Sequence, residues 1–470
     1  MAAEENFIVA IVLGSSKITA VAGRKQPDGA IQVLACTQES SDTFIRKGRI
    51  NNVTKMKQCI INMKEKLEKK LQKSISQTYI GIGGMGMHTV GNTVVRNFDA
   101  KTTISAEVVN AMGAENKASA TGDRYIYEVV PQEYKIGTQY QIDPVGIQAE
   151  SFEGRYLNIV ANSSMHEDVA NCFHNAGLNI AGCPISVLAL SELILSESEK
   201  RSGCVLVDMG SETTTVAVFK NNLLRHLAVI PLGGANVNRD ITSLQIEDNE
   251  AEDLKLHYGS ALYEGALDEK QPIKLKDGRQ IKFEEFAGLV EARMEEIILN
   301  IAHQIELSKY DKNQLIGGIV VTGGVANMKN IDKAFEQHTR FEKLRFVTKG
   351  GGRMQVSTKI SDFNRDGSYN AALAIIDKGE ANCCGGELGS DTPSLFDSEN
   401  AGDSVQQTPV TPVKPEVPVT PAPEPEPEPE EPKKPKGPNF FSRIVNRVKK
   451  AATELVSDND GINSRKDSEE

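Results

Sequence analysis

The sequence lacks three features that mark common classes of protein. No stretch approaches the roughly 20 apolar residues that a membrane-spanning helix needs, and the N-terminus, with Glu4 and Glu5 before a short apolar run, does not resemble a signal peptide. The 7 cysteines are scattered without metal-ligand spacing, which favours a reduced cytosolic interior over a disulfide framework. A formal net charge of −11 argues against a dedicated nucleic-acid-binding protein, so no nucleic-acid partner is expected.

What the chain does contain is typical of a soluble globular protein with an appendage. Its 470 residues, 39% apolar and 25% charged, predict two or three domains. Of the 19 prolines, 13 fall between Pro393 and Pro438, around a run in which proline and glutamate alternate. Such a composition cannot bury enough apolar surface to fold, so residues 385–438 are predicted to form a disordered linker.

The sequence CVLVDMGSETTTVAVF, residues 204–219, predicts a β-hairpin, because two runs rich in β-branched residues flank a polar turn. Gly210 in the turn would let a ligand approach the backbone, and the turn amides with the hydroxyls of Ser211, Thr213 and Thr214 are suited to an anion. Asp208, at the end of the first strand, is placed to hold a metal ion or to orient a water molecule. On its own this pattern also fits an ordinary sheet hairpin.

An internal repeat favours the phosphate-binding interpretation. The sequence VAIVLGSSKITAVAG, residues 9–23, has the same design, with Gly14 at the position of Gly210. Two similar hairpins about two hundred residues apart indicate a duplicated α/β unit, with one phosphate loop in each copy. The copies differ at one position that matters for chemistry, because Val12 stands where the second copy has Asp208.

Further elements follow from hydrophobic periodicity. Helices are expected at residues 53–71, 105–120 and 283–307, and the last is long and amphipathic. The GIGGMG run at Gly81 matches a dinucleotide fingerprint, but we reject that interpretation because a strand-like segment follows it where the fingerprint requires a helix.

Two further segments are candidates for ligand contacts. A strand over residues 316–322 ends in two glycines, and such a turn at the carboxyl edge of a sheet is where α/β proteins bind ligands. In a short helix over residues 251–259, Glu252 and Lys255 share one face, and on spacing alone they form an ordinary surface ion pair.

The last helical segment, residues 439–457, is strongly amphipathic. Large apolar residues lie on one stripe and basic residues on its flanks, which predicts an interfacial helix on anionic lipid, although a helix that docks on protein would show the same pattern. The residues expected at the membrane are Phe440, Phe441, Arg443, Ile444, Val445, Arg447, Val448, Lys449 and Lys450.

Taken together, these motifs resemble the FtsA family, the actin-like bacterial proteins that tie FtsZ filaments to the inner membrane. LGSSKITAVAG and VDMGSETTTVAVF resemble the two phosphate motifs of the family, and IVVTGGVANMKNI resembles its adenosine motif. VVPQEYKI and DPVGI resemble its inserted subdomain.

The resemblance implies an α/β, actin-like fold of duplicated ribonuclease-H-like units with a small inserted α+β subdomain, a disordered linker and a C-terminal amphipathic helix. The expected parts are a first subdomain 1–83, completed by 163–202 and 363–384; the insertion 84–162; a second subdomain 203–235 with 316–362; its outer part 236–315; the linker 385–438; the lipid helix 439–457; and an acidic tail 458–470.

The resemblance also implies a site for ATP and Mg²⁺. One phosphate loop would consist of Gly14, Ser15, Ser16 and Lys17, and the other of Asp208, Gly210, Ser211 and Thr213, with Asp208 as a metal or water ligand. The adenosine would lie against Gly233, Gly234, Glu252, Lys255, Gly323, Gly324 and Val325. Arg293, on the long helix, matches a family arginine at which the acidic C-terminal tail of FtsZ would bind, although a structural ion pair is the alternative.

Two departures from the family pattern affect this expectation. Val12 stands where relatives carry Asp or Glu, and Glu212 stands where many relatives have Gly. A missing metal-side carboxylate and an added acid beside the triphosphate should weaken binding or hydrolysis of Mg-ATP, so we expect at most slow turnover.

The expected function is that of an ATP-binding protein that polymerises at the inner membrane of the septum, anchors FtsZ and recruits downstream divisome proteins. An enzyme of the same superfamily, such as a sugar kinase, is one alternative, but no carboxylate base can be named for it. An actin-like pilus-assembly adaptor is the other, and the long linker and lipid helix count against it.

Overall fold

A computed structural model describes residues 6–119, 122–265, 271–347, 355–360, 363 and 366–387. The lipid helix 439–457, the acidic tail and all but the first three residues of the expected linker lie outside the described residues.

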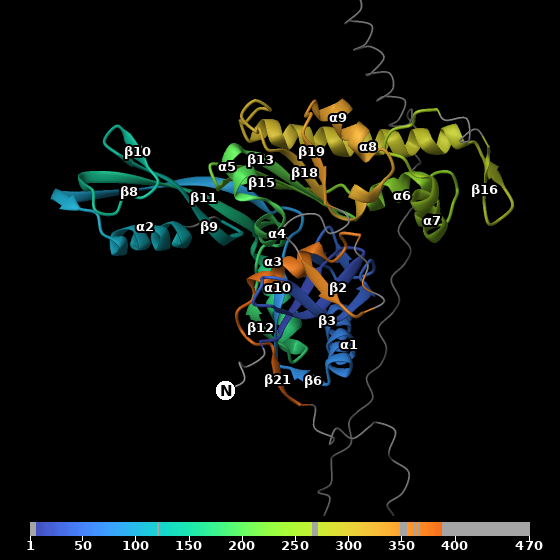
Figure 1. The fold of residues 1–470 in the computed structure, drawn as a ribbon, viewed down its shortest axis with the longest axis horizontal. Coiled ribbons are helices and arrows are strands. Elements are labelled where there is room, and N and C mark those ends of the chain that lie inside the picture. Colours follow the sequence, from blue (N-terminus) through green and yellow to red (C-terminus); the bar gives the residue numbers. More distant parts are fainter. Residues whose placement is uncertain are drawn as a thin grey trace, which may run out of the picture. The chain divides into compact units, whose positions relative to one another are not determined.

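The first half of the protein is built on a six-stranded sheet in the order β12-β7-β1-β2-β3-β20 (Figure 1). The strands are β1 (Ile8–Leu13), β2 (Lys17–Lys25), β3 (Ile31–Ser40), β7 (Gln77–Gly81), β12 (Asn179–Gly182) and β20 (Val356–Thr358). β1, β2 and β3 form an antiparallel meander, whereas β7 lies parallel to β1 and β12 parallel to β7. Helices α1 (Val53–Leu71), α3 (Ser163–Asn175), α4 (Ser186–Ile194) and α10 (Asn370–Lys378) belong to this half.

The second half repeats this topology. Its strands are β13 (Cys204–Met209), β14 (Thr214–Lys220), β15 (Leu223–Ile230), β18 (Gly318–Thr322) and β19 (Leu344–Phe346). β13, β14 and β15 again form an antiparallel meander, β18 lies parallel to β13, and β19 lies parallel to β18. The strand orders 3-2-1-7-12 and 15-14-13-18-19 are therefore equivalent, and the predicted duplication is confirmed.

The helices of the second half are α6 (Gly234–Thr242), α7 (Asp248–Tyr258), α8 (Phe283–Leu307) and α9 (Ile331–Thr339). On α8 the fully buried side chains Phe286, Val290, Met294, Ile297 and Ile301 recur every three or four residues, so one stripe of the helix faces the core. α8 packs on α6, α9 and the strands β14 and β15. Among the described residues, no helix is both long and apolar enough to cross a membrane.

The expected insertion forms a small α+β unit with its own core. β8 (His88–Thr103), β9 (Arg124–Ile136), β10 (Gln139–Gln141) and β11 (Gln148–Asn162) carry α2 (Ala106–Ala118) on one face, at the left of Figure 1. Their buried side chains include Ile104, Met112, Phe152 and Tyr156. A single residue pair, His88 with Ala228, joins β8 to β15, so this unit extends the sheet of the second half.

The chain returns to the first half earlier than we expected. We placed residues 316–362 with the second sheet, but β20 lies parallel to β3 in the first sheet. Ile31, on β3, is almost fully buried beside it. The short strand VST offered no sequence pattern that distinguishes the two sheets.

The remaining elements are short. They are β4 (Ile45–Arg46), β5 (Arg49–Ile50), β6 (Lys73–Ile75), β16 (Ile273–Lys274), β17 (Gln280–Ile281), β21 (Cys384–Glu387), α5 (Glu197–Ser202) and the 3₁₀ helix η2 (Gly324–Asn327). β4 and β5 pair with each other through a tight turn, and β21 pairs with β6 near the end of the described chain.

Candidate functional site

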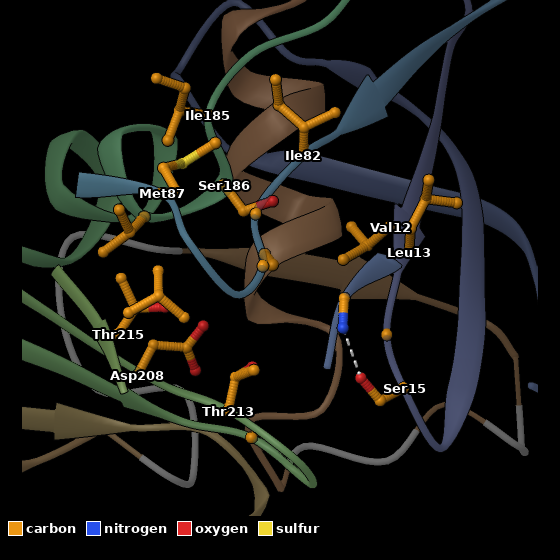
Figure 2. Close-up of a pocket in the computed structure, with 18 of the residues that line it drawn as sticks. Val12, Leu13, Ser15, Ile82, Met87, Ile185, Ser186, Asp208, Thr213 and Thr215 are labelled. Carbon is orange, nitrogen blue, oxygen red and sulfur yellow. Dashed lines mark hydrogen bonds between the residues drawn. The ribbon is translucent and has the colours of Figure 1, made fainter. Parts of the chain in front are cut away.

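The two repeated hairpins meet at one pocket. Figure 2 shows Asp208 and Thr213 of the second hairpin on one side, and Val12 and Ser15 of the first on the other. The lining comes from both halves and comprises Val12, Leu13, Gly14, Ser15, Gly48, Ile82, Gly83, Gly84, Met87, Ile185, Ser186, Val187, Asp208, Gly210, Ser211, Thr213, Thr215, Val229 and Ala371. The two hairpin turns, which are distant in sequence, therefore face a common space.

The first loop is held mainly by contacts to its backbone. The buried hydroxyl of Ser41 donates to the Gly14 carbonyl at 2.6 Å, and the Ser41 amide donates to the Ser16 carbonyl at 3.0 Å. A Cβ on Gly14 would lie 2.4 Å from the Lys17 carbonyl oxygen, so the tight turn requires glycine. Ser41 was not among the sequence candidates, because only the fold brings it to the loop.

Only part of the expected first loop faces the pocket. Gly14 and Ser15 line it, but Ser16 and Lys17 do not. The Lys17 ammonium instead donates to Gln38 Oε1 at 3.2 Å on the neighbouring strand β3.

The second loop contributes all four of its expected residues, since Asp208, Gly210, Ser211 and Thr213 line the pocket. The Gly210 amide donates to the Thr213 carbonyl at 2.9 Å and closes the turn. Thr214 does not face an anion, because its hydroxyl is buried and donates to the Leu232 carbonyl at 2.9 Å. Alternation along β14 turns this residue to the opposite face.

The carboxylate of Asp208 has no hydrogen bond or ion pair with any described residue, although its backbone lies in the sheet. Burial raises the pKa of its carboxyl group to about 6. An unpaired carboxylate in such a place is suited to a cation supplied from outside the chain. Within the described residues no group of three or more His, Cys, Asp or Glu side chains is arranged around a metal. The Asp208 carboxylate would fit Mg²⁺ if phosphate oxygens supplied further ligands.

The expected adenosine residues form a second group beside the second loop. The Gly234 amide donates to the Gly210 carbonyl at 3.1 Å, which fixes the start of α6 against that loop. A Cβ on Gly234 would lie 3.0 Å from Val325 Cγ2 and 3.6 Å from Lys255 Nζ. A Cβ on Gly323, where φ is +93°, would lie 2.7 Å from an Asp208 carboxylate oxygen.

Glu252 and Lys255 belong to this second group, and Lys255 Nζ donates to Glu252 Oε2 at 2.7 Å. The side-chain amide of Asn238 donates to the same Glu252 oxygen. The single side-chain oxygen of Asn238, Oδ1, is buried and has no hydrogen-bond partner among the described residues. No sequence pattern pointed to Asn238, which lies fourteen residues before Glu252 on a different helix. Gly233 and Gly324 lie at the starts of α6 and η2.

Glu212 does not occupy the position that we expected. Its buried carboxylate is not part of the pocket lining and turns toward the first half, where it accepts from Arg46 Nη1 at 3.0 Å and from the Lys47 amide at 2.6 Å. The acid that we expected beside the triphosphate therefore has partners of its own outside the pocket lining. Val12, in contrast, lines the pocket as an apolar side chain opposite Asp208.

Arg293 already has partners within the chain. Its guanidinium contacts Asp240 through Nε at 2.5 Å and Nη2 at 2.9 Å, and it also contacts Glu296. These contacts raise the pKa of Arg293, with the Asp240 hydrogen bonds as the main cause. The arrangement is that of a structural ion pair, and an acidic peptide would have to compete with Asp240 for this side chain.

The pocket gives a matched test of the first loop. Gly14→Ala should raise the Kd for ATP by about tenfold, since the new Cβ forces the loop to move and costs it a contact with the ligand. Gly83→Ala is the control, because Gly83 also lines the pocket but an added Cβ there meets no atom within 4 Å. Titration of a fluorescent ATP analogue measures both. Equal effects of the two substitutions would contradict this assignment of the loop.

The duplicated sheets, the hairpin from each half at one pocket and the helix that begins on the second loop define an actin-like α/β protein. In agreement with this class, the fold matches a solved PilM-PilN type IV pilus biogenesis complex with a TM-score of 0.54 at 13% identity, over 79% of this chain and 98% of that one.

Sequence comparison finds similarity to one family of cell-division proteins. The family described as "Cell division protein FtsA" matches residues 205–374. The chain is 29% identical over 387 residues to FtsA of Neisseria meningitidis serogroup B, covering 80% of this chain and 91% of the relative. It is 27% identical over 340 residues to FtsA of Porphyromonas gingivalis, covering 71% of each, and 24% identical over 404 residues to FtsA of Escherichia coli K12, covering 82% and 93%. Over most of its length the chain is therefore similar to the FtsA cell-division proteins.

Proposed function

We propose that this cell-division protein binds Mg-ATP between its two halves, polymerises at the cytoplasmic face of the inner membrane, and links FtsZ filaments to the septum. The observation that carries the proposal is the shared pocket, because hairpins from both copies of a duplicated unit present glycine turns and hydroxyls to one space beside Asp208. Backbone amides and hydroxyls in such turns are suited to phosphate oxygens.

In this proposal the phosphates lie between Gly14 and Ser15 on one side and Gly210, Ser211 and Thr213 on the other. Mg²⁺, bound through Asp208 and phosphate oxygens, would neutralise the charge of the triphosphate. Glu252 and Lys255 would contact the ribose and base, with Gly323 and Val325 beside them. Since Val12 supplies no second carboxylate, we propose slow turnover at most, and a nucleotide that serves assembly more than catalysis.

The membrane and partner roles rest on the sequence of the C-terminal part and on the similarity to FtsA proteins. The helix 439–457 would attach the protein to anionic lipid reversibly, and a filament would add many such helices through high effective concentration. The FtsZ tail would bind near Arg293, in competition with Asp240. Downstream divisome proteins would be recruited to the same filament.

The alternatives receive less support. A sugar kinase needs a carboxylate base aimed at a substrate hydroxyl, and the only aspartate or glutamate in the pocket lining is Asp208. The likeness to the pilus protein concerns the fold alone, since the identity is 13%.

A sedimentation assay with the full chain tests this proposal. The protein is mixed with anionic liposomes and with a peptide of the FtsZ C-terminal tail, with and without Mg-ATP. We expect the protein and peptide to pellet together with the liposomes, and filaments to appear on lipid with ATP. A protein that neither binds the peptide nor assembles on lipid would overturn the proposal, and phosphorylation of a sugar would favour the kinase.

A further inference from the structure

The turn between β4 and β5 is bonded to both phosphate loops through successive amides. The Lys47 amide donates to the Glu212 carboxylate at 2.6 Å, in the second loop, and the Gly48 amide donates to the Ser15 hydroxyl at 2.9 Å, in the first. Arg46 adds an ion pair of 3.0 Å to Glu212. This three-residue segment, residues 46–48, therefore bridges the two halves at the edge of the pocket.

The backbone of this turn is specialised for the task. Lys47 and Gly48 both have positive φ, of 50° and 75°, so that adjacent amides can point to different partners. A Cβ on Gly48 would lie 2.5 Å from Gly84 Cα, so the turn also packs directly on the segment that leads into β8. The Lys47 carbonyl accepts from the Met85 amide at 2.8 Å, which secures that contact.

The charges explain why Glu212 tolerates burial. Its side chain is only 9% exposed, and it receives an ionic partner and a backbone amide, whereas Arg46 remains 56% exposed. A buried carboxylate with these partners is costly to leave unpaired, so separation of the two halves at this point is disfavoured. The contacts hold the second loop at a fixed distance from the first.

We propose that residues 46–48 and Glu212 form a latch that sets the spacing of the two phosphate loops, so that Glu212 is a positioning residue that promotes nucleotide binding. The proposal rests on the proposed ATP site. Two loops that are already at the right separation contact the same phosphates without a closing movement. The free energy of nucleotide binding is then not spent on ordering the loops.

The direction of the effect distinguishes this proposal from electrostatic repulsion. Glu212→Gln keeps an oxygen for the Lys47 amide but loses the ion pair, and we expect it to raise the Kd for Mg-ATP about threefold; Glu212→Ala loses both contacts and should raise it about tenfold. If the Glu212 charge simply repels the phosphates, Glu212→Gln tightens binding instead. Tighter or unchanged binding would overturn the latch.

A double-mutant cycle tests the pairing. Arg46→Ala should weaken binding about as much as Glu212→Gln, and the double variant should be no worse than either, because both changes break one ion pair. If the effects of the two single substitutions on the binding free energy added up in the double variant, the two residues would act separately. The control is Glu264→Gln, which breaks the exposed surface pair with Lys333 and should leave the Kd unchanged.

Amide hydrogen exchange, measured on the nucleotide-free full chain, tests the latch whether or not the protein binds ATP. The Lys47 and Gly48 amides should exchange at least fivefold faster in Glu212→Ala than in the wild type, while amides of the buried strand β13 stay protected. Unchanged exchange at residues 46–48 would overturn the latch even if ATP binds. Faster exchange in a protein that binds no ATP would leave the latch intact and reject the proposed nucleotide site.

Discussion

Asp208→Asn should make the nucleotide-free protein more stable at pH 7 and should remove most of its Mg-dependent affinity for ATP. Burial raises the pKa of Asp208 from 3.8 to about 6, which means that the folded protein disfavours the charged carboxylate. Asparagine has nearly the same shape and no charge. We expect a gain of about 2 kcal/mol in the free energy of unfolding at pH 7.

The pH dependence follows from the sign of the shift. A carboxyl whose pKa is higher in the folded state favours folding when it is protonated. The unfavourable contribution of Asp208 is therefore absent below about pH 3.8, and it develops as the pH rises toward about 6. The advantage of Asp208→Asn should shrink as the pH is lowered from 7 to 4. Urea unfolding at several pH values, in buffer with a metal chelator, measures it.

A matched surface aspartate provides the control. Asp253 is exposed and pairs with Lys276 at 2.8 Å, and this hydrogen bond lowers its pKa. Asp253→Asn should therefore give no gain at pH 7. If Asp208→Asn instead lowered the stability at pH 7, the carboxylate would be making a stabilising contact, and the interpretation of its environment would be wrong.

The affinity for nucleotide should change in the opposite direction. The Asp208 carboxylate is the metal-side ligand that we propose, so Asp208→Asn should raise the Kd for Mg-ATP at least tenfold. Binding measured without Mg²⁺ should not weaken, because the substitution removes a negative charge that would face the polyanion. A site residue that lowers the stability of the empty protein is a common compromise between stability and function.

The sequence predicted the duplicated fold because its signal is periodic and local. The segments 9–23 and 204–219 each consist of two β-rich runs around a polar turn, and both form antiparallel strand pairs around Gly14 and Gly210. The helix at 283–307 has the bounds that its apolar stripe predicts. The short strand β20 was assigned to the wrong sheet, since three residues carry too little pattern to choose a partner.

The site was less predictable, because side-chain direction depends on contacts between distant segments. Lys17 was expected to contact the phosphates, but its ammonium donates a hydrogen bond to Gln38. Thr214 faces the interior instead of the pocket. Glu212 is adjacent to a phosphate-loop residue in sequence, yet its partners Arg46 and Lys47 lie more than 160 residues away. No spacing rule on a single chain connects these positions.

Removal of residues 439–470 should abolish binding of the protein to anionic liposomes and leave ATP binding unchanged. As the helix that the sequence predicts, the segment would place Phe440, Phe441 and Ile444 on one apolar stripe, with basic side chains on its flanks. Each basic residue near an anionic surface contributes about 1 kcal/mol, in addition to the burial of apolar area. We expect at least a hundredfold fall in lipid partitioning, which sedimentation with vesicles measures.

Two further variants separate the contributions to lipid binding. Removal of residues 458–470 alone takes away an acidic tail and should change partitioning by less than about twofold, so it controls for truncation. Phe440→Ser combined with Phe441→Ser should weaken binding at every salt concentration, because it removes apolar burial. Arg443→Gln combined with Lys449→Gln should weaken binding at low salt and matter little at high salt, since salt screens the basic contribution. Unchanged binding after removal of 439–470 would place the membrane contact in the folded part of the chain and would reject the helix as the anchor.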